Sequence, residues 1–458
     1  MNSPPAPYYS PTPSAIITCW PIVESFVDFE STIATAQTCR GLHGTIVDAD
    51  TEKIKVSHFE VHNYPPSPSS YTASRDAGAK SGIPEIPHYL SRSLNSIHFP
   101  SLRRLHLDFP LTKRRNKTGH DDIIEDVCNS SFPIFATNLA YAKNLESLYL
   151  DASRLMAIER SGHLESLYEI LGANLSKCNK LRELSVRNVG IGRASNDWLY
   201  SVAFMRALIP TLKKRKLDLE SLQIFIAGIP SDPLYERFLS TRGINAIFDF
   251  FLTALTLKKL ETLDFIISSS HNHLNAIIEA AMRLSSSHEM EKPSYIQNLK
   301  LSYVELGVVD IVHSTALSSA APLLNYFSEC NQLRSLFLEL PSECWNGCEN
   351  IQALSNLLSN KPDMTSLTIS FACCQDSNGK IVKVLSDFVC RQNRNNSNEL
   401  CKFSVFGLLN ADESDLDCLR VLLKESGMAC SKYEMRDSSD VGRKNVMIID
   451  YLRIKRVV

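Results

Sequence analysis

The sequence has none of the short motifs that identify common enzymes. Its 458 residues contain no Gly-x-Gly-x-x-Gly, no Walker phosphate loop, no Gly-x-Ser-x-Gly elbow and no His-Glu-x-x-His. The usual signatures of nucleotide binding, serine hydrolysis and zinc proteolysis are therefore excluded. Only 17 residues are glycine, so the chain has little material for phosphate-binding loops. We expect no catalytic residue, no metal site and no cofactor.

An excess of one charge sign is also missing. The chain has 48 Lys and Arg against 50 Asp and Glu, a formal net charge of −2. Because no basic excess is available to attract phosphates, we expect neither a nucleic-acid partner nor an anionic membrane. No run of 18 apolar residues occurs, and the sequence predicts no membrane span.

The cysteines do not form a disulfide pattern. All 13 are sparse and irregularly spaced, which is typical of reduced thiols in an intracellular protein. Residues 1–14 are rich in Pro and Ser and lack an early basic residue. They make a poor signal peptide, and we expect them to be disordered. A cytoplasmic location is predicted, and short basic runs at 113–117 and 213–216 leave nuclear import open.

A six-residue pattern, apolar-x-x-apolar-x-apolar, recurs along most of the chain. Its copies follow one another at intervals of 31 to 43 residues. The nine copies begin at Leu102, Leu145, Leu181, Leu219, Leu260, Ile296, Leu333, Met364 and Leu400. The closing apolar-x-apolar positions have the period of two of a short strand.

The segments between the copies have helical spacing. Apolar residues recur at helical intervals over 164–175, 323–327 and 354–358, so each unit is predicted to contain a strand followed by a helix. One such unit cannot bury its apolar face alone, and stacking of neighbours would supply the core. The alternative is a set of unrelated strands in several α/β domains.

The pattern resembles the leucine-rich repeat, Leu-x-x-Leu-x-Leu followed three positions later by Asn or Cys. Here that last position holds Pro110, Ser153, Val189, Ala227, Ser268, Val304, Pro341, Ala372 and Leu408. The repeats are also longer than is usual, which resembles the ribonuclease-inhibitor-like subclass. The resemblance implies an α/β solenoid over residues 92–458, with parallel strands on a concave face and helices on the convex face.

The residues between the inward-facing apolar positions are expected to point away from the helices, toward a partner. Aromatic and arginine side chains dominate binding hot spots. The sequence therefore predicts a protein ligand on the concave face, bound by Tyr149, Arg187, Phe225, Phe337, Glu339 and Phe406.

Residues 15–50 precede the repeats and show two short helical patterns. Their end, with Ala34, Ala36, Cys39 and Arg40, resembles an F-box, although Trp20 replaces the usual Leu. The resemblance implies docking of an Skp-type adaptor, and through it a cullin, by Pro21, Ile22, Phe26, Val27 and Ile33. The alternative is a helical cap over the first repeat, which every solenoid needs.

Residues 51–62 alternate like one strand, which would begin the solenoid. Residues 63–91 are rich in Pro and Ser and are predicted to be a connector. Three functions stay open: an F-box-like substrate receptor of a ubiquitin ligase, a repeat scaffold with no ubiquitin link, and an enzyme with a non-local site in the inter-repeat loops.

Overall fold

The computed structural model describes the repeat region with gaps between its elements. The residues described are 57–61, 94–108, 132–151, 163–188, 197–213, 218–226, 233–268, 271–286, 295–304, 319–371, 379–394, 400–409, 412–438 and 444–452, with Lys53, Lys55 and Cys374. The predicted disordered terminus (1–14), adaptor-binding or capping segment (15–50) and connector (63–91) all lie outside these residues.

The described strands form one 12-stranded sheet, and the first ten are parallel and follow the chain order. They are β1 (His58–Val61), β2 (Arg104–Asp108), β3 (Ser147–Asp151), β4 (Glu183–Asn188), β5 (Ser221–Ile226), β6 (Thr262–Ser268), β7 (Asn298–Val304), β8 (Ser335–Glu339), β9 (Ser366–Ser370) and β10 (Lys402–Leu409). Each of the nine motif copies forms one of the strands β2 to β10. The α/β repeat fold is confirmed, and the hypothesis of separate domains is wrong.

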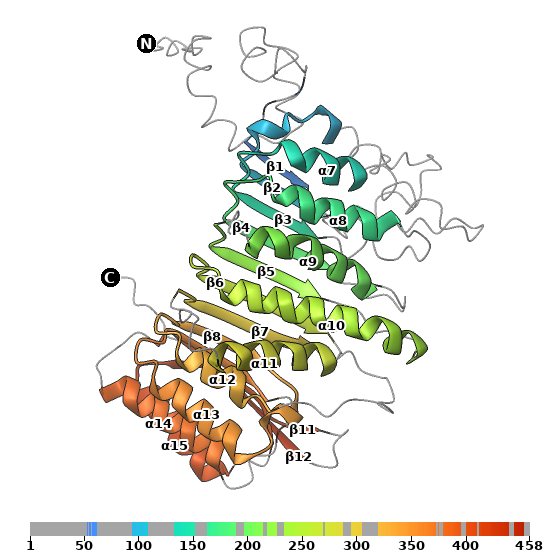
Figure 1. The fold of residues 1–458 in the computed structure, drawn as a ribbon. Helices are drawn as coiled ribbons and strands as arrows, with labels where there is room; N and C mark the ends of the chain where they lie inside the picture. Colours follow the sequence, from blue (N-terminus) through green and yellow to red (C-terminus); the bar gives the residue numbers. More distant parts are fainter. Residues whose placement is uncertain are drawn as a thin grey trace, which may run out of the picture.

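Helices follow the strands and cover one face of the sheet (Figure 1). They are α7 (Phe132–Asn138), α8 (His163–Leu175), α9 (Asp197–Lys213), α10 (Pro233–Leu255), α11 (His271–Ser286), α12 (Ala321–Ser328), α13 (Cys348–Ser359), α14 (Lys380–Arg394) and α15 (Glu413–Glu425), with the short 3₁₀ turns η1 (Phe99–Ser101), η3 (Leu139–Tyr141) and η5 (Ser342–Trp345). The helical spacing read in 164–175, 323–327 and 354–358 corresponds to α8, α12 and α13. None of the helices in the described ranges is long and apolar enough to cross a membrane.

The core lies between the sheet and the helices. Motif leucines such as Leu148 and Leu150 on β3 are buried, and each pairs with the equivalent residue of the next strand, Leu148 with Leu184 and Leu150 with Val186. The register therefore stacks equivalent apolar residues of successive repeats into continuous rows. This stacking supplies the core that a single strand and helix cannot form alone.

Polar side chains near the C-terminal ends of the helices link successive repeats. At the turns between helices and strands they donate to main-chain carbonyls of the preceding repeat. Asn174 Nδ2 lies 2.8 Å from the Ala136 oxygen, Lys361 Nζ lies 2.7 Å from the Cys330 oxygen, and Gln392 Nε2 lies 3.1 Å from the Lys361 oxygen. The degenerate repeats are thus linked at their helix ends.

The C-terminal end departs from the repeat order. Strand β12 (Lys444–Leu452) pairs antiparallel with β10, and β11 (Ala429–Ser438) pairs antiparallel with β12. Two antiparallel pairings restore the original direction, so β11 runs parallel to β10 but one position further out. The solenoid expected over 92–458 therefore has its last parallel neighbours at β9 and β10. The reason is that only residues 439–443 connect β11 to β12, whereas a parallel crossover needs about a dozen or more residues.

Candidate binding surface on the open face

The sheet face opposite the helices, called the open face below, carries the side chains that alternate with the core leucines. Register places equivalent positions of successive strands side by side. The central row runs His106, Tyr149, Ser185, Gln223, Asp264, Lys300, Phe337, Thr368 and Ser404, and the row two residues further on includes Asp151, Arg187, Phe225, Ile266, Ser302, Glu339, Ser370 and Phe406.

One cluster lies over β2 to β5 and consists of His106, Tyr149, Arg187 and Phe225; we call it the aromatic–arginine cluster. The rings of His106 and Tyr149 stack with centroids 4.0 Å apart. The Arg187 guanidinium carbon lies 5.5 Å from the centroid of the Tyr149 ring, a cation–π contact. Arg187 is exposed, Tyr149 and Phe225 are half-buried, and Phe225 is the register neighbour of Arg187. Three of the predicted ligand-binding residues therefore share one patch.

A second cluster lies over β6 to β8 and consists of Asp264, Lys300, Ser302, Phe337 and Glu339; we call it the ion-pair cluster. Lys300 Nζ lies 3.2 Å from Asp264 Oδ2 and 5.6 Å from the Phe337 ring centroid. Ser302 Oγ donates to Glu339 Oε2. The lysine charge in this cluster is thus neutralised within the sheet.

The ion-pair cluster also contains an unsatisfied polar atom. The second carboxylate oxygen of Asp264, Oδ1, is buried and has no hydrogen-bond partner in the described part of the chain.

The predicted binding residues do not all come together. Phe337 and Glu339 belong to the ion-pair cluster, but Ser370 on β9 separates Glu339 from Phe406 on β10. Around Phe406, the open-face residues Thr368 and Ser404 are buried. The two clusters therefore lie over β2 to β8, and Phe406, also half-buried, lies two strands beyond Glu339.

The ion pair between Lys300 and Asp264 could have been predicted from the motif, although neither residue is among the predicted binding residues. Asp264 and Lys300 occupy the same central position of consecutive motif copies, and opposite charges at neighbouring positions of a sheet favour pairing. His106 and Tyr149 likewise occupy the same central position of consecutive motif copies, and aromatic side chains at such neighbouring positions interact. Reading the central positions across repeats would have found both.

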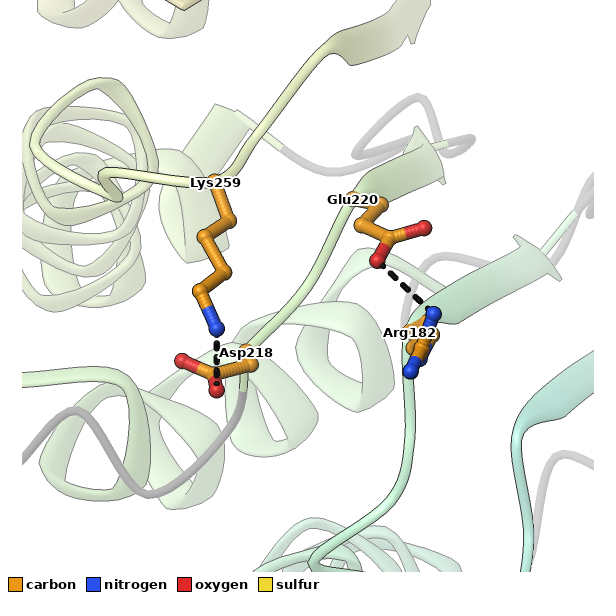
Figure 2. A network of polar contacts seen from close by, with 4 residues as sticks. All are labelled: Arg182, Asp218, Glu220 and Lys259. Carbon is orange, nitrogen blue, oxygen red and sulfur yellow. Dashed lines mark hydrogen bonds and ion pairs between the residues drawn. The ribbon is translucent and has the colours of Figure 1, made fainter.

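The edge at which the strands begin carries exposed ion pairs (Figure 2). Arg182, directly before β4, lies 3.3 Å from Glu220, directly before β5, and Lys259 lies 2.7 Å from Asp218. All four side chains are strongly solvent-exposed, so each pair contributes about 0–1 kcal/mol. Further along this edge, Gln297, Arg334, Lys361 and Asp363 line a hollow of about 370 Å³.

The buried cysteines have the properties of packing residues. Burial raises the pKa of Cys178, Cys330 and Cys344 to about 12, which keeps these thiols protonated at neutral pH and poorly reactive. Within the described ranges, no three His, Cys, Asp or Glu residues gather in a geometry for a metal ion.

The predicted adaptor-binding residues, Pro21, Ile22, Phe26, Val27 and Ile33, lie outside the described residues. No family model matches this chain, and no curated protein matches it.

Proposed function

We propose that this protein binds another protein through the open face of β2 to β8. The observation that carries the proposal is the in-register surface of aromatic and charged side chains on that face. Tyr149, Phe225 and Phe337 keep part of their rings accessible, and Arg187 is exposed. These residue types supply most of the binding energy in protein interfaces.

The helical face offers a useful contrast. Its exposed large apolar residues, which include Ile170 on α8, Met282 on α11 and Val421 on α15, come from separate helices. Scattered single residues of this kind are normal on a protein surface. The open face, by comparison, presents neighbouring aromatic and charged groups on consecutive strands. Seven strands at a spacing of about 4.8 Å give this face a span of about 29 Å.

In the fuller form of the proposal, the chain is a substrate receptor. Residues 15–50, with their F-box-like end, would dock an Skp-type adaptor and cullin while the open face holds the protein to be ubiquitinated. Such a receptor acts by proximity, because one chain that binds two partners raises their effective concentration. A repeat scaffold without the ubiquitin link is the alternative.

Site-specific photocrosslinking tests the open-face proposal. We would replace Phe225 with a photoreactive benzoylphenylalanine in the full chain and use Val421, exposed on α15, as the matched control. Irradiation in cells should give discrete protein adducts from position 225 and few from position 421. Adducts from position 421 alone would contradict the assignment of the binding face.

Co-precipitation tests the receptor form separately. The full chain and a version lacking residues 1–48 would be mixed with an Skp-type adaptor and cullin. We expect the full chain to retain both and the truncated chain to lose them. If a folded full chain retains neither, the scaffold alternative replaces the receptor.

A further inference from the structure

We infer that the aromatic–arginine cluster binds a carboxylate side chain of the partner, on an extended segment with an aliphatic residue about three positions away. This inference rests on the proposed function and names the chemistry of its partner. It depends on a difference between two cations in the open-face rows described above, Arg187 and Lys300.

Lys300 already has an anion. Its amine is ion-paired with Asp264 at 3.2 Å, and the carboxylate is mostly shielded from solvent. A ligand carboxylate at this position would have to compete with that pair. Lys300 therefore provides a comparison for Arg187, because its charge is already paired within the fold.

Arg187 is exposed and forms no ion pair with any described residue. Asp151 is its register neighbour on β3, yet no ion pair joins the two. The guanidinium instead lies against the Tyr149 ring at 5.5 Å, and Tyr149 is itself stacked on His106. The stack restricts the arginine side chain before a ligand arrives, which lowers the entropy lost on binding. Its planar N–H groups remain suited to a carboxylate.

The charge of the site favours a monoanion. Arg187 forms no ion pair within the described part of the chain, and a single guanidinium matches one carboxylate in charge. A phosphate group carries close to two negative charges at neutral pH and is usually met by several cationic groups. A glutamate or aspartate side chain therefore fits better than a phosphorylated one.

The apolar residues next to Arg187 indicate what else the bound segment should contain. Phe225 and Ile266 follow Arg187 on the next two strands, and both are half-buried. Two strand spacings place Ile266 about 10 Å from Arg187, which is close to the length of three residues of extended chain. An aliphatic residue three positions from the acidic residue would reach this apolar surface.

Three synthetic peptide pools test the inference on the immobilised full chain. The first has the form Leu-x-x-Glu-x-x-Leu with capped ends, the second has Gln in place of Glu, and the third has phosphoserine. Retained peptide is measured by mass spectrometry at low salt. We expect the Glu pool to be retained about tenfold better than the Gln pool, the effect of one charge-assisted contact.

Two variants identify the residue responsible. Arg187→Gln should remove the preference for Glu over Gln, whereas Lys300→Gln, the matched control, should leave it intact. Circular dichroism checks that both variants stay folded, which is expected for substitutions on this accessible face. Raising the salt concentration should weaken the preference in the wild-type chain.

Several results would overturn the inference. These are equal retention of the Glu and Gln pools, no retention of either, a Glu preference that survives Arg187→Gln, or stronger retention of the phosphoserine pool. The crosslinking experiment shows whether the carboxylate inference alone is wrong or whether the open-face proposal is wrong as well. Adducts at position 225 without a Glu preference leave the open-face proposal standing and remove only the carboxylate assignment.

Discussion

Lys361 provides the sharpest test of how the repeats hold together. It lies in the turn between α13 and β9, and only 2% of its surface is accessible. Its amine donates to the main-chain oxygens of Ser328 at 2.8 Å and Cys330 at 2.7 Å, at the C-terminal end of α12. A cation suits this position because the last carbonyls of a helix lack intrahelical partners and carry partial negative charge.

Lys361→Met keeps an unbranched side chain of similar length and removes the amine that donates both hydrogen bonds. A hydrogen bond to a charged group contributes about 1.5–3 kcal/mol net, so loss of the two bonds should lower the free energy of unfolding by about 3 kcal/mol or more. Urea unfolding followed by circular dichroism measures the loss. The control is Lys383→Met, on the exposed side of α14, which should change stability by less than about 0.5 kcal/mol.

The pH dependence of the free energy of unfolding tests the same contact independently. Burial lowers the pKa of Lys361 below the ordinary 10.5, although the nearby Cys330 opposes the shift. Between the lowered folded-state pKa and 10.5, the unfolded chain binds more protons, so the stability of the wild type rises with pH. The gap between wild type and Lys361→Met should therefore widen as pH rises from the lowered folded-state pKa toward 10.5, by at most about 1.4 kcal/mol per pH unit. A gap that is absent, or that narrows, would refute the reasoning.

Three further predictions concern packing, capping and the exposed edge. Gly172→Ala on α8 would place its Cβ 2.6 Å from the Ala207 Cβ on α9 and should cost about 1–3 kcal/mol by urea unfolding. Adding Ala207→Gly should recover part of the loss, and strictly additive losses would contradict the contact. Hydrogen bonds from Ser414 lower the pKa of Asp412, the N-cap of α15. The advantage of wild type over Asp412→Ala in α15 amide protection should therefore shrink as pH falls below the ordinary aspartate pKa of 3.8 and through the lowered folded-state pKa. A double-mutant cycle on Arg182 and Glu220 should give a coupling below about 1 kcal/mol, and a value above about 2 kcal/mol would show that these ion pairs hold the edge together.

Much of the open face follows from the repeat alone. Once the motif copies are aligned, Arg187 and Phe225 fall on neighbouring strands at the same position, as the structure has them. How the predicted binding residues group on this face does not follow from the repeat. Ser370 on β9 separates Phe406 from Glu339, and the nearby Thr368 and Ser404 are buried. Their burial depends on what packs around them and not on their place in the motif.

The helix pattern shows the same limit on a smaller scale. Ile170 has the apolar spacing of α8, as do Leu171 and Leu175, yet it is exposed while the two leucines are buried. An apolar stripe is wider than the part of it that contacts the sheet and the neighbouring helices.

The sequence by itself determined the strand and helix of each repeat and the order of the ten parallel strands. Those features depend on local periodicity and on the stacking of each unit against the next along the chain. The tertiary structure alone decided that β12 lies between β10 and β11, that Arg187 lies over Tyr149, and that Lys361 caps α12. These arrangements join residues of different repeats, and their side-chain contacts depend on the three-dimensional neighbours that folding brings together.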